Sequence, residues 1–562
     1  MAAGGVAGCY VWRTLAGVPA SAARVEVWWD VGHVRVNRDG LGSRNAIGVN
    51  GTLPVPPVQI TEGDTLVLHV RNSLSVTTSI HAHGILQTGT PFMDGAAMVT
   101  QCGIPPNSSF TYEYQINQAG TFWLHGHDNH QNADGLRAPL VVHDRYPPVK
   151  YDYEYLLAFE DWYHAEFAVR MDATQNPLLP FPPPPSFPSV LVNGAYGNST
   201  RPLLFRPGST YRIRLINMAT TEWIHFSMPG HQLCVIEADG VYTEPRPAAS
   251  LSLGPGQRYS VLVTAHNSTA FNYRYHAALY ASFVPQRDGA NPRRLSGLIE
   301  YRAGAPVADD APTAEEDNAV LSGAVELLPL GDGSDVQLRT LHGQPALPVD
   351  RTLSLVVGGA RYTDSITRDV INNVTYARPL VPTLYSALTM GGKAMLPVVY
   401  GPQTNTVVLR SGENVELTLI NPSSLPHIIH LHGHVFQIIE YGPVDLRLFP
   451  GLNANLTGIP VRRFAGWPME RDTVVIPKLN YATIRFCANN PGVWLLHCHM
   501  DVHFAMGMAM TFVEAPDVLQ KTLRVPNAMI QMCSEQGISV SGNAVGKQGV
   551  DLSGLPLAPV LA

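Results

Sequence analysis

Four pairs of histidines, each pair separated by one residue, carry the chemistry that this sequence suggests. They are His81/His83, His125/His127, His430/His432 and His497/His499. Residues two apart on a β-strand point to the same face, so each pair can present two imidazoles to one cavity. One such pair is a weak signal, but four of them indicate a cluster of metal ions. Neutral imidazole suits copper, zinc, iron and nickel, so the pairs do not choose the metal.

The stretch "HCHMDVHFAMGM" at residues 497–508 does choose the metal. If the flanking histidines face the cluster, the Cys498 thiolate points to the opposite side of the strand, where a second site must lie. A cysteine with two histidines and a weak axial methionine is the ligand set of a blue copper centre. His427 and His503 can supply the imidazoles, and Met508 can supply the second sulfur. One strand would then connect a one-electron copper to a multi-metal cluster.

The elements that position these residues are predicted to be short β-strands. Runs such as "TLVLHVRN", "TYRIRLIN" and "VELTLIN" have the alternation and the flanking turn residues of strands. A glycine turn followed by such a run recurs at residues 62–74, 207–226 and 411–424. In the first and third copies a His-x-His follows, whereas the middle copy has only His225. We therefore predict a triplicated β-sandwich in which the middle copy carries no metal cluster.

Breaks in composition divide the chain, whose 562 residues are too many for one hydrophobic core. The first break lies at residues 143–152, and the second is a charged, Ala/Pro-rich segment at residues 302–317. The predicted divisions are a first domain at 25–148, a second at 149–305, a linker at 306–345, a third domain at 346–540 and a tail at 541–562. The first and third domains would carry all the copper ligands.

Composition excludes several classes of partner. Only 14% of the residues are charged and the net charge is -7, so no basic face indicates nucleic acid or an anionic membrane. No uninterrupted apolar run is long enough to span a bilayer, and we expect a monomer. The apolar N-terminus, with small residues at 20–22, indicates a weak or truncated signal peptide. Six N-glycosylation sequons also favour the secretory pathway or an extracellular location.

Four motifs together resemble a known family. "HAHG", "HGHDNHQNADG", "HIIHLHGHVF" and "HCHMDVHFAMGM" occur in this order. Over residues 30–535 the chain resembles multicopper oxidases of the laccase, ascorbate oxidase and ferroxidase group, fungal ferroxidase-like and pigment-type members above all. The resemblance implies three consecutive cupredoxin-like Greek-key β-sandwich domains that hold four copper ions, one of type 1, one of type 2 and two of type 3. It also implies that single electrons from a substrate reduce O2 to water.

The same resemblance assigns roles to individual residues. The type 1 copper would be held by His427, Cys498 and His503, with Met508 axial. The type 2 copper would be held by His81 and His430. The type 3 pair would be held by His83, His125, His127, His432, His497 and His499. Asp94 and Asp501 match the acidic positions that the family places beside its cluster, where a buried carboxylate can relay protons.

The remaining cysteines are also interpreted by resemblance. Cys102 and Cys533 occupy positions like those of the family's bridge between the first domain and the tail. Cys234 and Cys487 lie within apolar strand patterns and are expected to be buried free thiols. Cys9 would belong to a segment that is removed.

Two electron donors fit the predicted site, and the residues around it favour a phenol. Because an axial methionine lowers the potential of copper, electron-rich phenols are the easier donors, as for a laccase-like oxidase of pigment or secondary metabolism. The alternative is a ferroxidase, in which acids hold Fe(II), a hard cation that prefers oxygen ligands. Asp161 sits where the resemblance places a ferroxidase glutamate, with Glu160 beside it. However, Ser423 replaces a second acid, and we expect no C-terminal membrane anchor.

A third possibility belongs to another class of protein. A copper-binding electron carrier without oxidase turnover would need only the type 1 ligands, or would lack part of the cluster. All ten histidines of the family's ligand set are present together with Cys498, which disfavours this reading.

Overall fold

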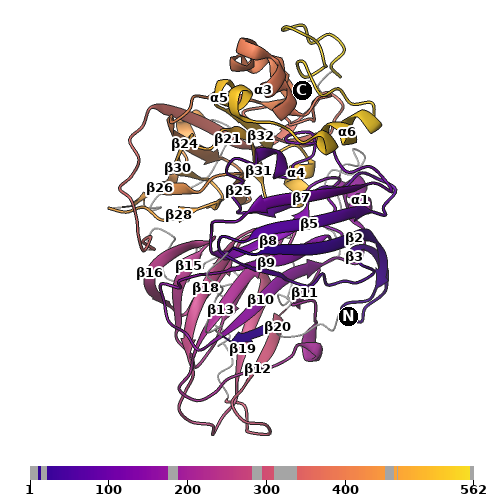
Figure 1. The fold of residues 1–562 in the computed structure, drawn as a ribbon. Helices are drawn as coiled ribbons and strands as arrows, with labels where there is room; N and C mark the ends of the chain where they lie inside the picture. The colour runs from indigo at the N-terminus through magenta and orange to yellow at the C-terminus, as the bar shows by residue number, and fades with distance from the viewer. Residues whose placement is uncertain are drawn as a thin grey trace.

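Three cupredoxin-like β-sandwiches, each made of two sheets, follow one another along the chain (Figure 1). The computed structural model describes residues 10–13, 22–174, 188–280, 294–308, 338–449, 461–464 and 466–556. In Figure 1 the third sandwich lies at the top, the first at the centre and the second below it. The prediction of an all-β fold with three consecutive sandwiches is confirmed.

The first sandwich packs the sheet β3-β2-β5-β7 against the sheet β4-β9-β8-β6. Its strands are β2 (Arg24–Val36), β3 (Arg44–Val49), β4 (Val58–Thr61), β5 (Thr65–Asn72), β6 (Ile80–His83), β7 (Ser109–Gln115), β8 (Gly120–Gly126) and β9 (Arg137–His143). β2 and β5 run parallel, and β7 pairs with β5 in the antiparallel direction. Leu66, Leu68 and Leu124 lie among the buried residues of its core.

The second sandwich contains the sheets β1-β10-β13-β18-β15-β16, with β11 beside β10, and β12-β20-β19-β14-β17. Its strands are β1 (Tyr10–Arg13), β10 (Tyr153–Trp162), β11 (Ser189–Val192), β12 (Leu203–Leu204), β13 (Thr210–Asn217), β14 (Trp223–Ser227), β15 (Leu233–Ala238), β16 (Val241–Ala248), β17 (Ser250–Leu253), β18 (Arg258–Thr264), β19 (Tyr273–Tyr280) and β20 (Arg294–Glu300). β1 lies within the predicted signal peptide and pairs with β10. β10 runs parallel to β13, as β2 does to β5.

The third sandwich contains the sheets β22-β21-β24-β30-β26-β27, with β28 beside β26, and β23-β32-β31-β25-β29. Its strands are β21 (Arg351–Arg361), β22 (Thr367–Ile371), β23 (Val407–Leu409), β24 (Asn414–Asn421), β25 (His427–Leu431), β26 (Phe436–Pro443), β27 (Arg462–Arg463), β28 (Glu470–Arg471), β29 (Thr473–Ile476), β30 (Asn480–Cys487), β31 (Gly492–Cys498) and β32 (Ala509–Glu514). β21 and β24 repeat the parallel pair of the other two sandwiches.

In each of the three recurring segments, at residues 62–74, 207–226 and 411–424, the strand ends in an asparagine with the same structural role. Asn72, Asn217 and Asn421 end β5, β13 and β24 and are completely buried. Each side-chain amide donates to a main-chain oxygen in the following loop, at 2.8, 3.0 and 2.7 Å respectively. Each side-chain oxygen accepts from the amide two residues later. Such turns fix the direction of the chain after a strand, so the three copies share one way of leaving the sheet.

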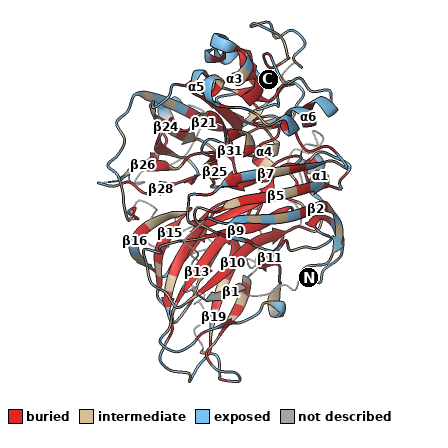
Figure 2. Ribbon diagram, in the orientation of Figure 1, coloured by how far each residue is buried: buried red, intermediate tan, exposed pale blue. Residues whose placement is uncertain are grey.

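Short helices cover the sandwiches. They are α1 (Phe167–Thr174), α3 (Thr383–Thr389), α4 (Asp501–Ala505), α5 (Pro516–Thr522) and α6 (Asn527–Glu535). Figure 2 shows that buried residues follow the strands, whereas α5 and α6 expose one side. α3 is buried from Thr383 to Ala387. Among the described residues, no helix combines the length and the apolar composition needed to cross a lipid bilayer.

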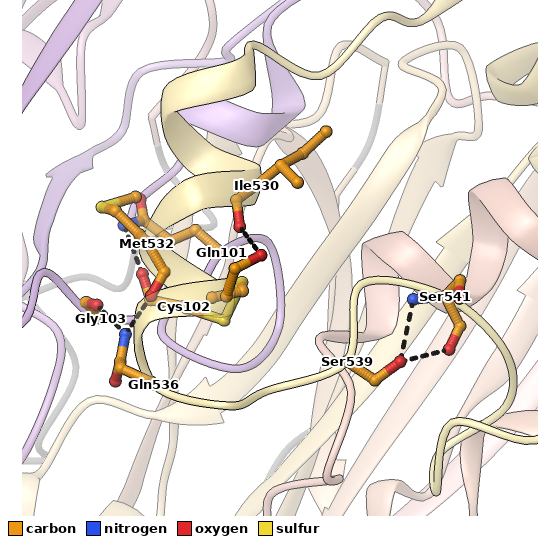
Figure 3. The surroundings of a disulfide bond; sticks show 10 residues. Gln101, Cys102, Gly103, Ile530, Met532, Gln536, Ser539 and Ser541 are labelled. Carbon is orange, nitrogen blue, oxygen red and sulfur yellow. Dashed lines mark hydrogen bonds between the residues drawn. A yellow bond between two sulfur atoms is a disulfide. The ribbon is translucent and has the colours of Figure 1, made fainter.

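A disulfide ties the C-terminal segment to the first sandwich. Cys102 and Cys533 are bonded across a sequence separation of 431 residues, which confirms the expected pairing (Figure 3). α6 carries Cys533, and its Met529 and Met532 side chains join the core of the first sandwich. The last described helix therefore completes the core of the first domain.

The other cysteines correct the sequence analysis in one respect. Cys234 and Cys487 are free, as expected, but they are only half-buried. Cys234 is the partly exposed residue of an otherwise buried β15, and Cys487 ends β30 at a position that is not fully covered. Cys9 lies outside the described residues.

Candidate metal centres

The histidine pairs lie at strand ends in the first and third sandwiches. β6 carries both His81 and His83. In each of the other three pairs the first histidine lies near the end of a strand, β8, β25 or β31, and the second follows that strand directly. Cross-strand pairing places His81 opposite His125 and His430 opposite His497. All eight histidines of the pairs are buried, with at most 6% of their surface exposed. One cluster therefore forms between two sandwiches that are distant in the sequence.

Ring contacts join the two halves of this cluster. The rings of His81 and His432 stack with their centroids 3.9 Å apart, and those of His83 and His430 stack at 3.7 Å. His83 Nδ1 lies 3.1 Å from His499 Nε2, so a histidine of β6 meets one that follows β31. Each of these contacts pairs one residue of the first sandwich with one of the third.

Hydrogen bonds to main-chain oxygens determine which ring nitrogen faces the cluster. His81 Nδ1 donates to the Asp94 carbonyl oxygen at 2.7 Å, and His430 Nδ1 donates to the Asp472 carbonyl oxygen at 2.8 Å. His497 Nδ1 similarly donates to a carbonyl oxygen at 2.9 Å. In each of these rings the lone pair available to a metal ion is therefore on Nε2. Such outer hydrogen bonds fix the tautomer of metal-binding histidines.

The nitrogens that remain fit metal ions. Among the described residues, five buried ring nitrogens of the cluster lack a hydrogen-bond partner: Nε2 of His81, His125, His127 and His430, and Nδ1 of His499. A buried polar atom without a partner costs free energy, and coordination to a metal removes that cost. Burial, aided by neighbouring imidazoles, also holds the pKa of His83, His127 and His430 well below its ordinary value. The rings are therefore neutral, as ligands must be.

A second site lies on the other side of β31. His503 Nδ1 lies 3.3 Å from Cys498 Sγ and 3.1 Å from His427 Nδ1, and His427 Nδ1 lies 4.0 Å from the sulfur. Burial raises the pKa of the Cys498 thiol to about 12, so the thiolate requires a positive ion beside it. Cysteine with two histidines is a set of donors that suits copper.

Met508 joins this second site through the backbone. Its carbonyl oxygen accepts from Cys498 N at 3.0 Å, and its own N–H donates to the His503 carbonyl oxygen at 3.0 Å. The side chain is fully buried in the core of the third sandwich with Cys498. The four predicted residues of this site therefore lie together.

Adjacent residues of β31 serve the two sites. His497 pairs with His430 and Cys498 pairs with Ile429, so β25 and β31 run side by side where the sites approach each other. Because side chains alternate along a strand, Cys498 faces the second site while its histidine neighbours face the cluster. The structure thus brings together the residues that the sequence analysis placed at both sites.

Asp94 lies against the cluster. Its carboxylate is completely buried and accepts from His432 Nδ1 at 2.8 Å, while Oδ1 lies 3.2 Å from His81 Nδ1. The residue follows the short helix of residues 91–93. Gly95 comes next with φ 85°, and a Cβ at that position would lie 1.9 Å from the Ile80 carbonyl oxygen. Only glycine lets this loop approach β6 closely enough to hold both histidines.

Asp501 lies at the start of α4 beside a cavity. Its Oδ2 accepts from Asn132 Nδ2 at 2.7 Å, and burial raises its pKa to about 7. The same cavity is lined by His125, Gly126, His127, His130, Asn132, Arg378, His497, Cys498, His499, Asp501 and Phe504. Asp501 therefore borders the space beside the cluster. The sequence analysis did not find Asn132 or Arg378, which carry no metal-binding signal.

Asp161 does not lie where a ferroxidase acid was expected. Only 2% of its surface is exposed, and its carboxylate accepts from Thr220 N, Thr220 Oγ1 and Thr221 N at 2.9 to 3.0 Å. Glu160 is equally buried and accepts from Arg38 and Arg137. The Asp161 carboxylate accepts hydrogen bonds from residues of its own sandwich, whereas Glu160 links β10 to Arg38 and Arg137 of the first sandwich. Both carboxylates are occupied by partners inside the protein, so they cannot receive an ion from solution.

Asp472 is another residue at the cluster that was not predicted from the sequence. Its Oδ1 lies 3.3 Å from His83 Nε2, and its carbonyl oxygen accepts from His430 Nδ1. It stands in "ERDTVVI", a stretch without histidine or cysteine. Its position directly before the buried strand β29 is the one local feature that could have identified it.

Comparisons with known proteins agree with this geometry. Family models described as multicopper oxidase match residues 30–147, 153–302 and 376–518. "Iron multicopper oxidase fer1" of Mycosarcoma maydis is 36% identical over 577 residues, covering 96% of this chain and 88% of that protein. "Iron transport multicopper oxidase fetC" of Epichloe festucae is also 36% identical, covering 96% and 84% of the two chains.

Solved structures give the same result. The multicopper oxidase Fet3p, described as functioning in iron import, has a TM-score of 0.85 at 28% identity and covers 96% of this chain and 100% of its own. A laccase from Botrytis aclada has a TM-score of 0.74 at 26% identity and covers 95% and 97%. The chain belongs to the multicopper oxidase family, whose copper-dependent oxidases reduce O2.

Proposed function

We propose that this chain is a ferroxidase, which takes single electrons from Fe(II) and passes them to O2. The observation that carries this proposal is the set of relatives that cover nearly the whole chain. The relatives from Mycosarcoma maydis, Epichloe festucae and Schizosaccharomyces pombe are 34 to 36% identical, and all carry names of iron or iron-transport multicopper oxidases. They favour the ferroxidase alternative over the laccase-like function expected from the sequence.

The proposed copper ligands are the residues gathered at the two sites, divided among the coppers as the family resemblance implies. His427, Cys498 and His503 would hold the type 1 copper, with Met508 beside them. The other ligands surround the cluster: His81 and His430 for the type 2 copper, and His83, His125, His127, His432, His497 and His499 for the type 3 pair. Bound copper supplies a one-electron acceptor at the first site and the centre of O2 reduction at the second.

The surrounding residues would orient the rings and supply protons. Asp94 holds His81 and His432 through their Nδ1 atoms, which leaves Nε2 directed at the cluster. The Asp501 carboxyl borders the cavity beside the cluster and accepts a hydrogen bond from Asn132. We therefore assign to it the delivery of protons to the reduced oxygen. Four Fe(II) ions give one electron each, and four protons with one O2 give two waters.

A phenol oxidase is the second candidate, and one contact favours it. Ser423 Oγ lies 3.2 Å from His427 Nε2, on the edge of the ring that faces away from Cys498. A hydroxyl at this position gives Fe(II) a neutral oxygen where a carboxylate would attract it more strongly. The likeness to the Botrytis aclada laccase points in the same direction.

Steady-state kinetics test the proposal. The copper-loaded protein is supplied with Fe(II) or with 2,6-dimethoxyphenol, and O2 uptake is followed with an electrode. We expect kcat/KM for Fe(II) to exceed that for the phenol by about tenfold or more, equivalent to about 1.4 kcal/mol. A preference for the phenol would reject the ferroxidase in favour of the second candidate. Absorption from the cysteine–copper site without O2 uptake from either donor would indicate an electron carrier instead.

A further inference from the structure

A loop of the second sandwich forms part of the wall of the histidine cluster, although the described residues of that sandwich supply no histidine to it. The loop spans residues 254–257 between β17 and β18, and Arg258 is the first residue of β18. Gly256 has φ 84°, and a Cβ there would lie 2.9 Å from His499 Cδ2 and 3.0 Å from His83 Cε1. Its backbone therefore lies directly against one histidine of the first sandwich and one that follows β31 of the third.

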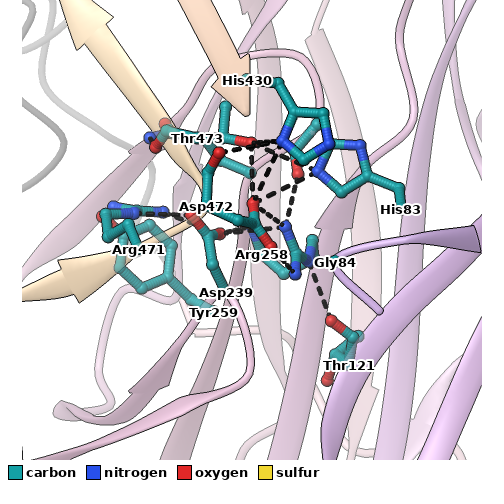
Figure 4. A network of polar contacts seen from close by, with 12 residues as sticks. His83, Gly84, Thr121, Asp239, Arg258, Tyr259, His430, Arg471, Asp472 and Thr473 are labelled. Carbon is teal, nitrogen blue, oxygen red and sulfur yellow. Dashed lines mark hydrogen bonds and ion pairs between the residues drawn. The ribbon is translucent and has the colours of Figure 1, made fainter. Parts of the chain in front are cut away.

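Arg258, directly after this loop, joins all three sandwiches (Figure 4). Its Nη1 and Nη2 donate to Asp472 Oδ1 and Oδ2 at 2.8 and 2.7 Å. Its Nε donates to the Thr121 carbonyl oxygen of β8 at 2.8 Å. Arg258 is fully buried and Asp472 is 1% exposed, so no water replaces these bonds at the surface. A bidentate pair of this kind fixes the orientation of both side chains.

Asp472, held in this way, in turn orients the ring of His83. His83 Nε2 lies 3.3 Å from Asp472 Oδ1 and 3.2 Å from Thr473 Oγ1, and the threonine hydroxyl donates to the same Oδ1 at 2.8 Å. A neutral imidazole that donates from Nε2 has its lone pair on Nδ1. The Nδ1 atom is the one that lies beside His499 Nε2. His83 is thus turned the opposite way from His81 and His430, whose Nδ1 atoms point away from the cluster.

Gly84 gives independent support for a close fit at this place. It follows His83 and has φ 88°. A Cβ at Gly84 would lie 2.5 Å from Arg258 Nη2 and 2.8 Å from Asp472 Oδ2. The ion pair therefore occupies the space that any other residue after His83 would fill, which accounts for the glycine of "HAHG".

We propose that the loop 254–257 and the Arg258–Asp472 pair position His83 and His499, so that the middle domain controls copper binding at a cluster to which its described residues give no ligand. Arg258 holds Asp472, Asp472 holds Nε2 of His83, and Gly256 supports the faces of both rings. The roles of Arg258, Gly256 and Asp472 are positioning roles. They apply whichever donor the enzyme oxidises, so their test is separate from the test of the ferroxidase proposal.

The pair of Arg38 and Glu160 provides a matched control. Arg38 Nη1 and Nη2 donate to Glu160 Oε2 and Oε1, both at 2.8 Å, and each side chain is only 3% exposed. These two bonds reach neither Asp472 nor a histidine of the cluster, so Arg38→Lys disturbs a similar buried pair without moving His83 directly. Lysine keeps the charge of arginine but cannot make both bonds of the bidentate pair.

The first experiment compares Arg258→Lys with Arg38→Lys in the full-length protein. Copper per chain is measured after dialysis against a copper chelator, together with the red absorption of the cysteine site, the near-ultraviolet shoulder of the paired coppers and the electron paramagnetic resonance of the type 2 copper. We expect Arg258→Lys to bind cluster copper about 10- to 100-fold more weakly while the red band is kept. Arg38→Lys should keep both signals. Equal losses in the two variants would overturn the proposal.

The second experiment compares Gly256→Ala with Gly304→Ala. Both glycines have positive φ, 84° and 76°, but a Cβ at Gly304 meets no atom within 4 Å, so this variant reproduces the backbone strain without the contact. We expect Gly256→Ala alone to lower the near-ultraviolet shoulder and to change the type 2 resonance. Identical copper content and spectra in the two alanine variants would overturn the proposal. The two experiments probe different atoms. Either one can therefore decide the proposal, provided that both of its variants fold.

Discussion

The Asp94 carboxylate of the first sandwich accepts a hydrogen bond from His432 Nδ1 of the third at 2.8 Å. The contact spans 338 residues of sequence. It shows that the cluster is held together by groups outside the ring of histidines as well as by the histidines themselves.

Removing this contact should impair O2 reduction and leave the cysteine site intact. In Asp94→Ala the buried Nδ1 of His432 loses its acceptor, and the ring is no longer held with Nε2 toward the cluster. Loss of such an outer partner typically costs about 10- to 100-fold in metal affinity or activity. We expect O2 uptake to fall by about this factor while the red absorption band persists. Asp39→Asn is a suitable control, because Asp39 is also buried and bonded to a histidine, His164, outside the metal sites.

A carboxylate at residue 423 should increase the preference for Fe(II). Ser423→Asp places a negative charge near His427 Nε2, where the serine hydroxyl now lies, and hard cations prefer carboxylate oxygen. We expect kcat/KM for Fe(II) to rise about tenfold, which corresponds to about 1.4 kcal/mol. Ser423→Asn has the same shape without the charge and should show no rise. An equal change in both variants would mean that the charge is not the cause.

Stability should fall as the pH rises above the ordinary range of a carboxyl group, because of Glu222. Burial, and then the charge of Asp161, raise the pKa of Glu222 to about 8, although Tyr163 donates a hydrogen bond to it at 2.8 Å. The folded chain keeps a proton here that the unfolded chain releases near pH 4.5, so the folded state loses stability between about pH 4.5 and 8.

Glu222→Gln removes this titration, and its melting temperature should therefore decrease less between pH 5 and 8 than that of the unchanged protein. Differential scanning calorimetry at both pH values measures the difference. Glu244→Gln, at an exposed position, should behave like the unchanged protein. Parallel curves for all three proteins would contradict the prediction.

Breaking the disulfide should loosen the C-terminal segment. Cys533→Ser removes a link that spans 431 residues and frees α6, whose Met529 and Met532 belong to the core of the first sandwich. We expect a loss of about 2–4 kcal/mol in the free energy of unfolding and earlier proteolysis within residues 523–540. Calorimetry and limited proteolysis test this. Cys234→Ser alters a free thiol and should change neither measurement.

The parts of this molecule that local sequence patterns determine could be predicted well. "TLVLHVRN" is β5 from end to end, and "TYRIRLIN" is β13, because alternation and flanking turns depend on neighbours in the chain. The histidine pairs and Cys498 could be assigned to two sites because their spacing of one residue has a fixed meaning on a strand.

The residues that were missed depend on packing between distant segments. Arg258 meets Asp472 across 214 residues, and Asp472 meets His83 across 389 residues. Neither hydrophobic periodicity nor a sequence motif indicates such long-range contacts. The prediction of Asp161 as a ferroxidase acid was wrong for the same reason. Its local sequence, "FEDWYH", does not indicate that Thr220 and Thr221 cover its carboxylate. Proximity to a motif in sequence is therefore a poor guide to exposure.

The distribution of ligands along the chain has a consequence for biosynthesis. All four residues of the cysteine site lie between 427 and 508, within one sandwich, whereas the cluster needs histidines from β6 and β8 as well. During translation the first sandwich leaves the ribosome with half of a binding site, and the other half emerges only near the end of synthesis. The proposed type 1 copper site requires only the folding of its own domain, whereas the proposed O2-reducing centre requires the first and third sandwiches to dock.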